Sequence, residues 1–90
     1  MARVSFTYAL KRFFPGIGTS EISGATVREI LSNLEQNYPG LSSYIVDDQG
    51  RVRQHVNIFV NNQLIEDRIA LSDQVGDRDE VYFMQALSGG

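Results

Sequence analysis

Polar and hydrophobic residues alternate along several short stretches of this chain, and a two-residue period is typical of a β-strand with one buried face. In residues 3–9 (RVSFTYA), the large side chains of Val4, Phe6 and Tyr8 stand on one side of such a strand. Residues 55–61 (HVNIFVN) show the same alternation. The pattern predicts strands over residues 3–9, 19–23, 55–61, 63–67 and 81–85.

One stretch follows a helical spacing instead. Its apolar residues recur every three or four positions and would form a single stripe facing a core: Val27, Ile30, Leu31, Leu34 and Tyr38. The stripe begins with TVRE (26–29), a capping box in which a threonine hydroxyl and a glutamate satisfy free backbone amides. It ends at NYPG (37–40), because a proline cannot continue a helix. We expect the main helix of the domain between these two motifs.

Turn residues separate the predicted elements. Pro15 and two glycines predict a loop over residues 11–18, and two asparagines, which tolerate positive φ, predict a tight turn at residues 61–62. The remaining segments are predicted to be short: a helical turn, a strand fragment and a loop (47–50) within residues 41–54, one helical turn in residues 70–75, and a turn over residues 76–80.

The predicted order is β-β-α-β-β-β, with one main helix to cover one face of one sheet, and this ordering allows an α+β roll. A long crossover would place the last strand parallel to the first, in the middle of a mixed sheet of four to five strands. We expect residues 1–85 to form this domain and residues 86–90 to form a flexible tail.

Alternation also predicts which side chains the helix leaves uncovered. If Val56, Ile58, Val60, Val81 and Phe83 face the helix, then Phe59, Tyr82 and Met84 point to the opposite face of the sheet. An exposed aromatic and methionine surface in a small protein indicates a contact with a partner protein. The alternative is that a long loop covers this face or that the exposure has no function.

Composition narrows the class of protein. Ninety residues, 42% of them hydrophobic and 21% charged, predict one soluble domain with a single core and little room for a deep cleft. The net charge of −3 argues against nucleic-acid binding, which needs a basic face. No apolar run is long enough to span a membrane and no leader precedes the domain, which favours a cytoplasmic location. The absence of cysteine excludes disulfides, thiolate metal sites and cysteine nucleophiles.

Candidate catalytic and metal-binding groups are sparse. His55 is the single histidine and reads as a solvated side chain rather than a general base or a metal ligand. Four acidic residues gather near the last strand but lack the spacing of a calcium loop, so a solvated turn is expected: Asp73, Asp77, Asp79 and Glu80. Residues 15–18 (PGIG) lack the lysine of a phosphate-binding loop. We therefore expect no catalytic site, no metal and no bound cofactor in this domain.

One further chemical group is the terminal carboxylate of Gly90. A partner that activated it would need a tip without side chains, because glycine lets two backbones approach closely. Gly89 would provide that access. Ser88 and Leu87 would follow it into the narrow channel that leads to the partner's active site. An ordinary frayed terminus is the alternative explanation of these residues.

Together these features resemble the ThiS/MoaD-type sulfur carriers, which are ubiquitin-like β-grasp proteins. The resemblance rests on the helix, the HVNIFVN strand (55–61), the GDRDEVYFM turn and strand (76–84), and the final Gly89 and Gly90. Within the family, NLEQNYPGL (33–41) followed by HVNIFVN looks most like the carrier of thiocarboxylate-dependent cysteine synthesis.

This resemblance implies a protein co-substrate rather than an enzyme. An E1-like adenylating enzyme of the ThiF/MoeB type would use ATP to activate Gly90, which would then bear a thiocarboxylate. Its sulfur would pass to an acceptor on a second enzyme, such as a cysteine-synthase-like enzyme. Phe59, Tyr82 and Met84 would form the docking face. A metalloprotease would be a further partner if residues had to be removed first to expose the terminal diglycine.

Three other roles remain open on the sequence. The chain could be a ubiquitin-like modifier conjugated to lysines, the small subunit of molybdopterin synthase, or an interaction domain with an inert tail. Conjugates on lysines, stable co-purification with a large subunit, or full activity without Gly89 and Gly90 would distinguish these roles.

Overall fold

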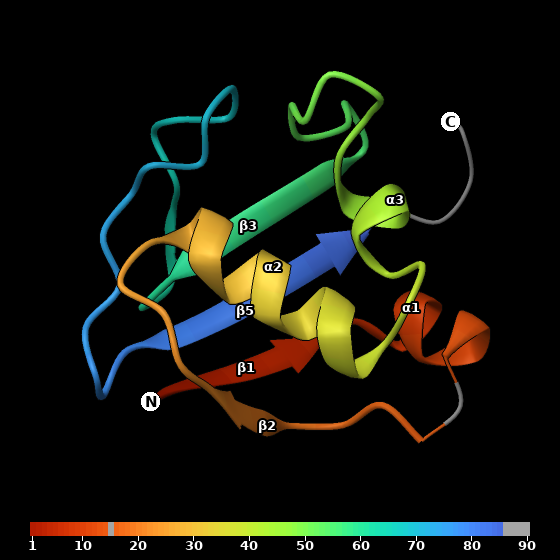
Figure 1. Ribbon diagram of the computed structural model, residues 1–90, viewed down its shortest axis with the longest axis horizontal. Coiled ribbons are helices and arrows are strands. Elements are labelled where there is room, and N and C mark those ends of the chain that lie inside the picture. The colour runs from red at the N-terminus through yellow and green to blue at the C-terminus, as the bar shows by residue number, and fades with distance from the viewer. Residues whose placement is uncertain (15, 86–90) are drawn as a thin grey trace.

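Five strands form one mixed sheet in the computed structural model of this chain, which describes residues 1–14 and 16–85 (Figure 1). The order across the sheet is β2-β1-β5-β3-β4. The strands are β1 (Ala2–Phe6), β2 (Ser20–Ile22), β3 (Val56–Val60), β4 (Gln63–Leu64) and β5 (Glu80–Gln85). The helices are α1 (Tyr8–Phe13), α2 (Val27–Asn37) and α3 (Ser42–Ile45). The α+β class and the predicted positions of all five strands are confirmed, although β1, β2, β3 and β4 are each shorter than predicted.

The last strand lies in the middle of the sheet. β5 runs parallel to β1, with Val4 opposite Val81, and antiparallel to β3, with Ile58 opposite Phe83. The long connection from β1 to β5 contains the main helix, as a parallel pair of strands requires. The predicted crossover and the central position of the last strand are therefore confirmed.

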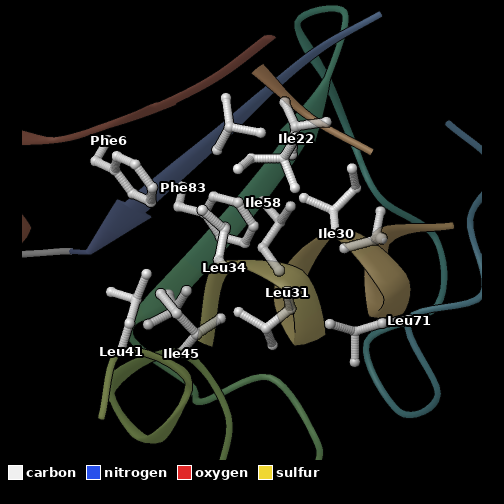
Figure 2. Packing of buried hydrophobic residues seen from close by; sticks show 14 of the residues in the cluster. Phe6, Ile22, Ile30, Leu31, Leu34, Leu41, Ile45, Ile58, Leu71 and Phe83 are labelled. Atoms are coloured by element: carbon white, nitrogen blue, oxygen red, sulfur yellow. The ribbon is translucent and has the colours of Figure 1, made fainter. Parts of the chain in front are cut away.

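The core lies between the sheet and α2, which crosses one face of it (Figure 1). Figure 2 shows side chains of α2, among them Ile30 and Leu34, directed toward Ile58 and Phe83 of the sheet. Phe83 also stacks on Phe6 of the neighbouring strand, with ring centroids 5.7 Å apart. All five of these residues, Phe6, Ile30, Leu34, Ile58 and Phe83, are buried. The apolar stripe predicted from helical spacing faces this core, apart from Tyr38, which is half-buried beside it.

The main helix begins and ends where the sequence predicts. The Thr26 hydroxyl accepts a hydrogen bond from the Glu29 amide at 3.2 Å. The Glu29 carboxylate accepts from the Ala25 amide at 2.8 Å, one residue before the amide of the usual capping box. At the other end the Tyr38 amide donates to Leu34 O, and the chain leaves the helix ahead of Pro39.

The strand predicted over residues 3–9 is too long, and the loop predicted over residues 11–18 is partly wrong. β1 ends at Phe6 and the chain then forms α1 (Tyr8–Phe13). Alanine, leucine, lysine and arginine, which follow Tyr8, are strong helix formers. Leu10 is fully buried, and it follows Val4, Phe6 and Tyr8 at the same two-residue spacing. The alternation therefore could not show that the strand ends and a helix begins.

The helical turn predicted over residues 70–75 is also wrong. A single turn closes earlier, where the Leu71 amide donates to Asp67 O at 3.1 Å, and Leu71 itself has a positive φ of 54°. The reason is Leu71, because a residue with a positive φ cannot continue a right-handed helix. The Asp67 carboxylate accepts hydrogen bonds from the amides of Ile69, Ala70 and Ser72 and so caps this single turn.

The remaining connections agree with the predictions. Asn61 and Asn62 have φ of 51° and 69° and form the turn between β3 and β4. Residues 41–54 contain α3, an isolated bridge between Val46 and Val52, and a turn at residues 48–49. The tail predicted over residues 86–90 lies outside the described residues.

We expect Leu34→Ala to lower the free energy of unfolding by about 2–5 kcal/mol, because it leaves a cavity between α2 and the sheet. That loss is a large share of the roughly 5–15 kcal/mol that stabilises a domain. Denaturant unfolding monitored by circular dichroism measures it. The control is Leu64→Ala, because Leu64 is 55% exposed and its loss should change stability by less than about 0.5 kcal/mol. Equal effects of the two substitutions would contradict this description of the core.

We expect the contribution of Asp67 to stability to depend on pH. The amides of the turn, that of Ala70 first, and the Ser72 hydroxyl lower the pKa of Asp67 to about 2 from its ordinary value of 3.8. The hydrogen bonds to the charged Asp67 carboxylate therefore stabilise the fold above pH 3.8. This stabilisation is lost as the pH falls from 3.8 toward 2 and the carboxylate is protonated. Asp67→Asn keeps one acceptor oxygen of the two, so this variant should unfold more easily than wild type at pH 7.

The difference between Asp67→Asn and wild type should shrink as the pH falls through this window. Thermal melts at pH 7, 5, 4, 3 and 2 would follow it. Asp48→Asn changes an exposed aspartate outside this turn and serves as the control. A stability difference that stayed constant down to pH 2 would contradict the role of the Asp67 carboxylate.

Candidate functional site

A row of side chains crosses the face of the sheet opposite α2. Tyr82 of β5 lies directly opposite Phe59 of β3, and their ring centroids are 6.3 Å apart. Met84 occupies the next position of the same face on β5, opposite Asn57. All three predicted residues, Phe59, Tyr82 and Met84, are half-buried, whereas their inward neighbours Val81 and Phe83 are fully buried. The alternation therefore places them as predicted, on one surface across two central strands.

Leu64 extends this surface, and the sequence analysis did not find it. It lies directly opposite Phe59 in the β3–β4 pair and is 55% exposed. Because β4 contains only Gln63 and Leu64, no alternation could show which way the leucine points. The pairing across the tight turn at residues 61–62 was the available signal, since directly opposed residues share a face. We refer to Phe59, Leu64, Tyr82 and Met84 as the outer-face patch.

The end of β5 is held on both sides by neighbouring strands. The Gln85 amide donates to the Thr7 hydroxyl at 3.3 Å, and the Thr7 amide donates to Phe83 O at 3.1 Å. On the other side Gln85 lies opposite Val56, and its Nε2 lies 3.3 Å from His55 Nε2. The chain that follows Gln85 therefore starts from a position fixed by β1 and β3.

The candidate metal ligands do not come together. Among residues 1–14 and 16–85, no group of three or more histidine or acidic side chains could hold a metal ion. Asp79 accepts hydrogen bonds from the Asn61 side chain and the Gly76 amide, and these lower its pKa. Asp73 accepts from the amides of Glu66 and Asp67. Asp73 and Asp79 thus accept hydrogen bonds from the protein itself, and His55 is exposed beside Gln85.

The tail residues proposed from the sequence, Leu87, Ser88, Gly89 and Gly90, lie outside the described residues. In the part of the chain that is described, no helix has the length and hydropathy needed to cross a membrane.

Comparison with known proteins assigns the chain to a family. The model of the ThiS family matches residues 14–90. The sulfur carrier protein CysO of Mycobacterium tuberculosis is 32% identical over 89 residues, which cover 97% of this chain and 96% of that protein. Small archaeal modifier protein 3 of Haloferax volcanii is 32% identical over 66 residues, or 73% of this chain and 71% of that protein.

Solved structures agree with the sequence relatives. The crystal structure of Mycobacterium tuberculosis CysO has a TM-score of 0.84 and 29% identity, with 97% of this chain and all of that chain covered. A chain of the Amycolatopsis orientalis BexX/CysO complex has a TM-score of 0.85 and 26% identity, with both chains fully covered. These neighbours share the ubiquitin-like β-grasp fold expected from the sequence.

The family match spans most of the chain, and the CysO similarity extends over nearly the full length of both proteins. The chain belongs to the ThiS family.

Proposed function

We propose that this protein is a sulfur carrier whose Gly90 carboxylate is converted to a thiocarboxylate. The observation that carries the proposal is the full-length similarity to CysO proteins, which are described as sulfur carriers, together with a ThiS match that runs through Gly90. Two features of the described domain support this role. The last described residue, Gln85, is held by both neighbouring strands, and a partly apolar surface that a partner enzyme could bind lies next to it.

The proposed chemistry takes place on the tail and in a partner's active site. A carboxylate is a poor electrophile, so an ATP-dependent enzyme of the ThiF/MoeB type first forms the acyl adenylate and releases pyrophosphate. A hydrosulfide then attacks the acyl carbon, the carbon–oxygen bond to AMP breaks, and the thiocarboxylate remains. Gly89 gives the partner close access to the reacting carbonyl, and Leu87 and Ser88 occupy the channel behind it. The carrier is consumed and regenerated, so it acts as a co-substrate.

The thiocarboxylate sulfur is then a nucleophile for an electrophilic acceptor. We propose an acceptor held by a biosynthetic enzyme of the cysteine-synthase type, on the basis of the similarity to CysO. Attack by sulfur displaces a leaving group from the acceptor carbon and forms a thioester between the carrier and the acceptor. Water then cleaves the bond between the acyl carbon and sulfur, which returns the Gly90 carboxylate and leaves the sulfur on the acceptor as a thiol.

The outer-face patch is the proposed docking surface for the activating enzyme. Its four side chains lie in neighbouring positions on β3, β4 and β5, and β5 leads directly to the tail. Aromatic residues and methionine contribute strongly to protein contacts because they bury a large area and adapt to a partner. A partner that covers this patch would hold the tail's origin at a constant distance from its own active site.

A second candidate function has one specific observation in its favour, the similarity to an archaeal modifier protein. In that role the activated Gly90 carbonyl would be attacked by a lysine amine of a target protein, and an isopeptide bond would form. Immunoblots of denatured cell extracts against an N-terminally tagged chain separate the two roles. Ladders of larger conjugates support modification, whereas a single unconjugated band with a thiocarboxylate supports sulfur transfer.

We expect the intact mass to rise by about 16 Da when the protein is incubated with ATP, its activating enzyme and a sulfide source, because sulfur replaces one carboxylate oxygen. Gly90→Ala should abolish most of this gain, because its side chain obstructs the approach to the nucleotide. Circular dichroism should show an unchanged fold in that variant. No gain for the wild-type chain would overturn the proposed function, and normal loading of Gly90→Ala would overturn the access argument.

We expect Tyr82→Asp to weaken binding of the activating enzyme at least about tenfold, because it replaces a central aromatic side chain of the patch with a charge. Its effect on stability should be near 1 kcal/mol, since Tyr82 lies on the partly exposed face. Isothermal titration calorimetry measures the binding. Ser32→Asp introduces the same charge on the exposed side of α2, which covers the other face, and should bind normally. Similar losses for both variants would contradict docking through this patch.

A further inference from the structure

A shallow groove of about 450 Å³ lies between the loop at residues 47–54 and the turn at residues 68–70. Three arginines, Arg51, Arg53 and Arg68, and one carboxylate, Asp47, supply its charged lining. Ile69 also lines it and is 69% exposed, so the groove offers one apolar side chain beside its charged groups. The groove is therefore basic and partly apolar on a chain whose net charge is −3.

Two of these guanidinium groups have backbone carbonyls as partners. Arg53 Nε donates to Ser43 O at 2.9 Å. Arg68 Nη2 donates to Arg53 O at 2.7 Å and to Val56 O at 2.8 Å. A carbonyl orients a guanidinium but carries no formal charge, so the positive charge of both arginines remains available to a partner.

Arg51 forms an ion pair with the carboxylate of the groove, Asp47. Arg51 Nε is 3.5 Å from Asp47 Oδ2, and its side chain is half exposed. The other Asp47 oxygen accepts from the amides of Gln49 and Arg51. The Arg51 amide is the main cause of a lowered Asp47 pKa, and the charge of Arg53 also lowers the pKa of Asp47. A long, exposed ion pair of this kind contributes little to stability, so Arg51 can turn to a partner at small cost.

The groove is rigid because its two walls are tied together. Arg28 of α2 donates to Ala70 O at 2.8 Å and to Gly50 O at 3.1 Å, one carbonyl on each wall. The Val52 amide donates to Arg68 O at 2.8 Å, and Arg68 returns a bond to Arg53 O. These contacts order the groove before any partner arrives, which lowers the entropic cost of binding.

Arg68 connects the groove to the strand that pairs with the outer-face patch and with the end of β5. Arg68 Nη1 donates to Asn57 Oδ1 at 3.3 Å, and Asn57 lies opposite Met84 of the patch. Arg68 Nη2 also holds Val56 O, and Val56 lies opposite Gln85, after which the tail begins. A partner that covered the patch and received the tail would therefore meet Arg68 at its edge, and Arg68 forms part of the groove.

We propose that this groove binds an acidic segment of the activating enzyme, a segment that also carries one apolar side chain for the contact with Ile69. The inference rests on the proposed function, since it names the chemistry of a partner that this function requires. Opposite charges at the edge of an interface steer the encounter and set the orientation of the two proteins. On an acidic carrier, a basic groove near the end of β5 would direct an acidic surface to the end of the domain from which the tail continues.

Charge reversal at Arg51 tests the inference, because this side chain is exposed and makes no bond that holds the fold together. We expect Arg51→Glu to slow association with the ThiF/MoeB-type enzyme of the same organism about five- to tenfold at low salt, and the loss to shrink at high salt. The maximal rate of loading at saturating carrier should stay unchanged. Arg78→Glu makes the same change of charge in the turn before β5, at the opposite end of that strand, and should have a much smaller effect.

Two further variants sharpen the result. Ile69→Ser should weaken binding at all salt concentrations, because it removes an apolar contact rather than a charge. Arg51→Gln should give a smaller loss than Arg51→Glu. Stopped-flow association at several salt concentrations and circular dichroism melts of each variant provide the measurements.

Equal effects of Arg51→Glu and Arg78→Glu, with normal loading of the wild-type chain, would overturn this inference and leave the proposed function intact. A selective effect of Arg51→Glu on the sulfur-accepting enzyme, with none on the activating enzyme, would also overturn it. If the wild-type chain were not loaded at all, the proposed function would fail first, and the mass measurement above would show this independently.

Discussion

The pairing of β5 with both β1 and β3 is the interaction on which the rest of the structure depends. It joins the N-terminal hairpin to the second half of the chain and puts Val81 and Phe83 at the centre of the core, where both are fully buried. The same pairing fixes the side chains that alternate with them, so Tyr82 and Met84 must lie on the outer face. It also decides where the strand ends, with Gln85 between Thr7 and Val56. Core, candidate docking surface and the origin of the tail thus follow from one central strand.

A domain of this size has one core and little further capacity, and its candidate functions are accordingly on its surface. The described residues do not bring three or more histidine or acidic side chains together in a group that could hold a metal ion. They offer instead a partly apolar patch, a basic groove at its edge and a fixed starting point for the chain beyond Gln85. For a protein proposed to act as a co-substrate, these features meet the need, because the reactive groups other than the carboxylate would belong to the partners.

Carboxylates in this protein serve mainly to order turns. Asp47, Asp67, Asp73 and Asp79 each accept at least one backbone amide hydrogen bond, and Glu35 accepts the amides of Gly40 and Ser42 between α2 and α3. Several arginines use backbone carbonyls in the same way. This division has an electrostatic consequence, because acidic and basic groups that bind the backbone do not neutralise one another. The positive charge of the basic groove is available because of this arrangement. The sequence contains no run of arginines that would have predicted the groove.

The sequence by itself determined the elements whose signals are local. The capping box and Pro39 bound the main helix, the asparagine pair makes the turn at residues 61–62, and alternation assigns Phe59, Tyr82 and Met84 to the face opposite α2. Only the tertiary structure decided where a local signal was ambiguous or absent. Leu10 continues the alternation of β1, but it lies in α1, where it is fully buried. Leu64 joins the patch through its cross-strand pair with Phe59, and Arg68 donates to Val56 O, 12 residues away in the chain. These contacts join separate segments, so the periodicity within one segment cannot predict them.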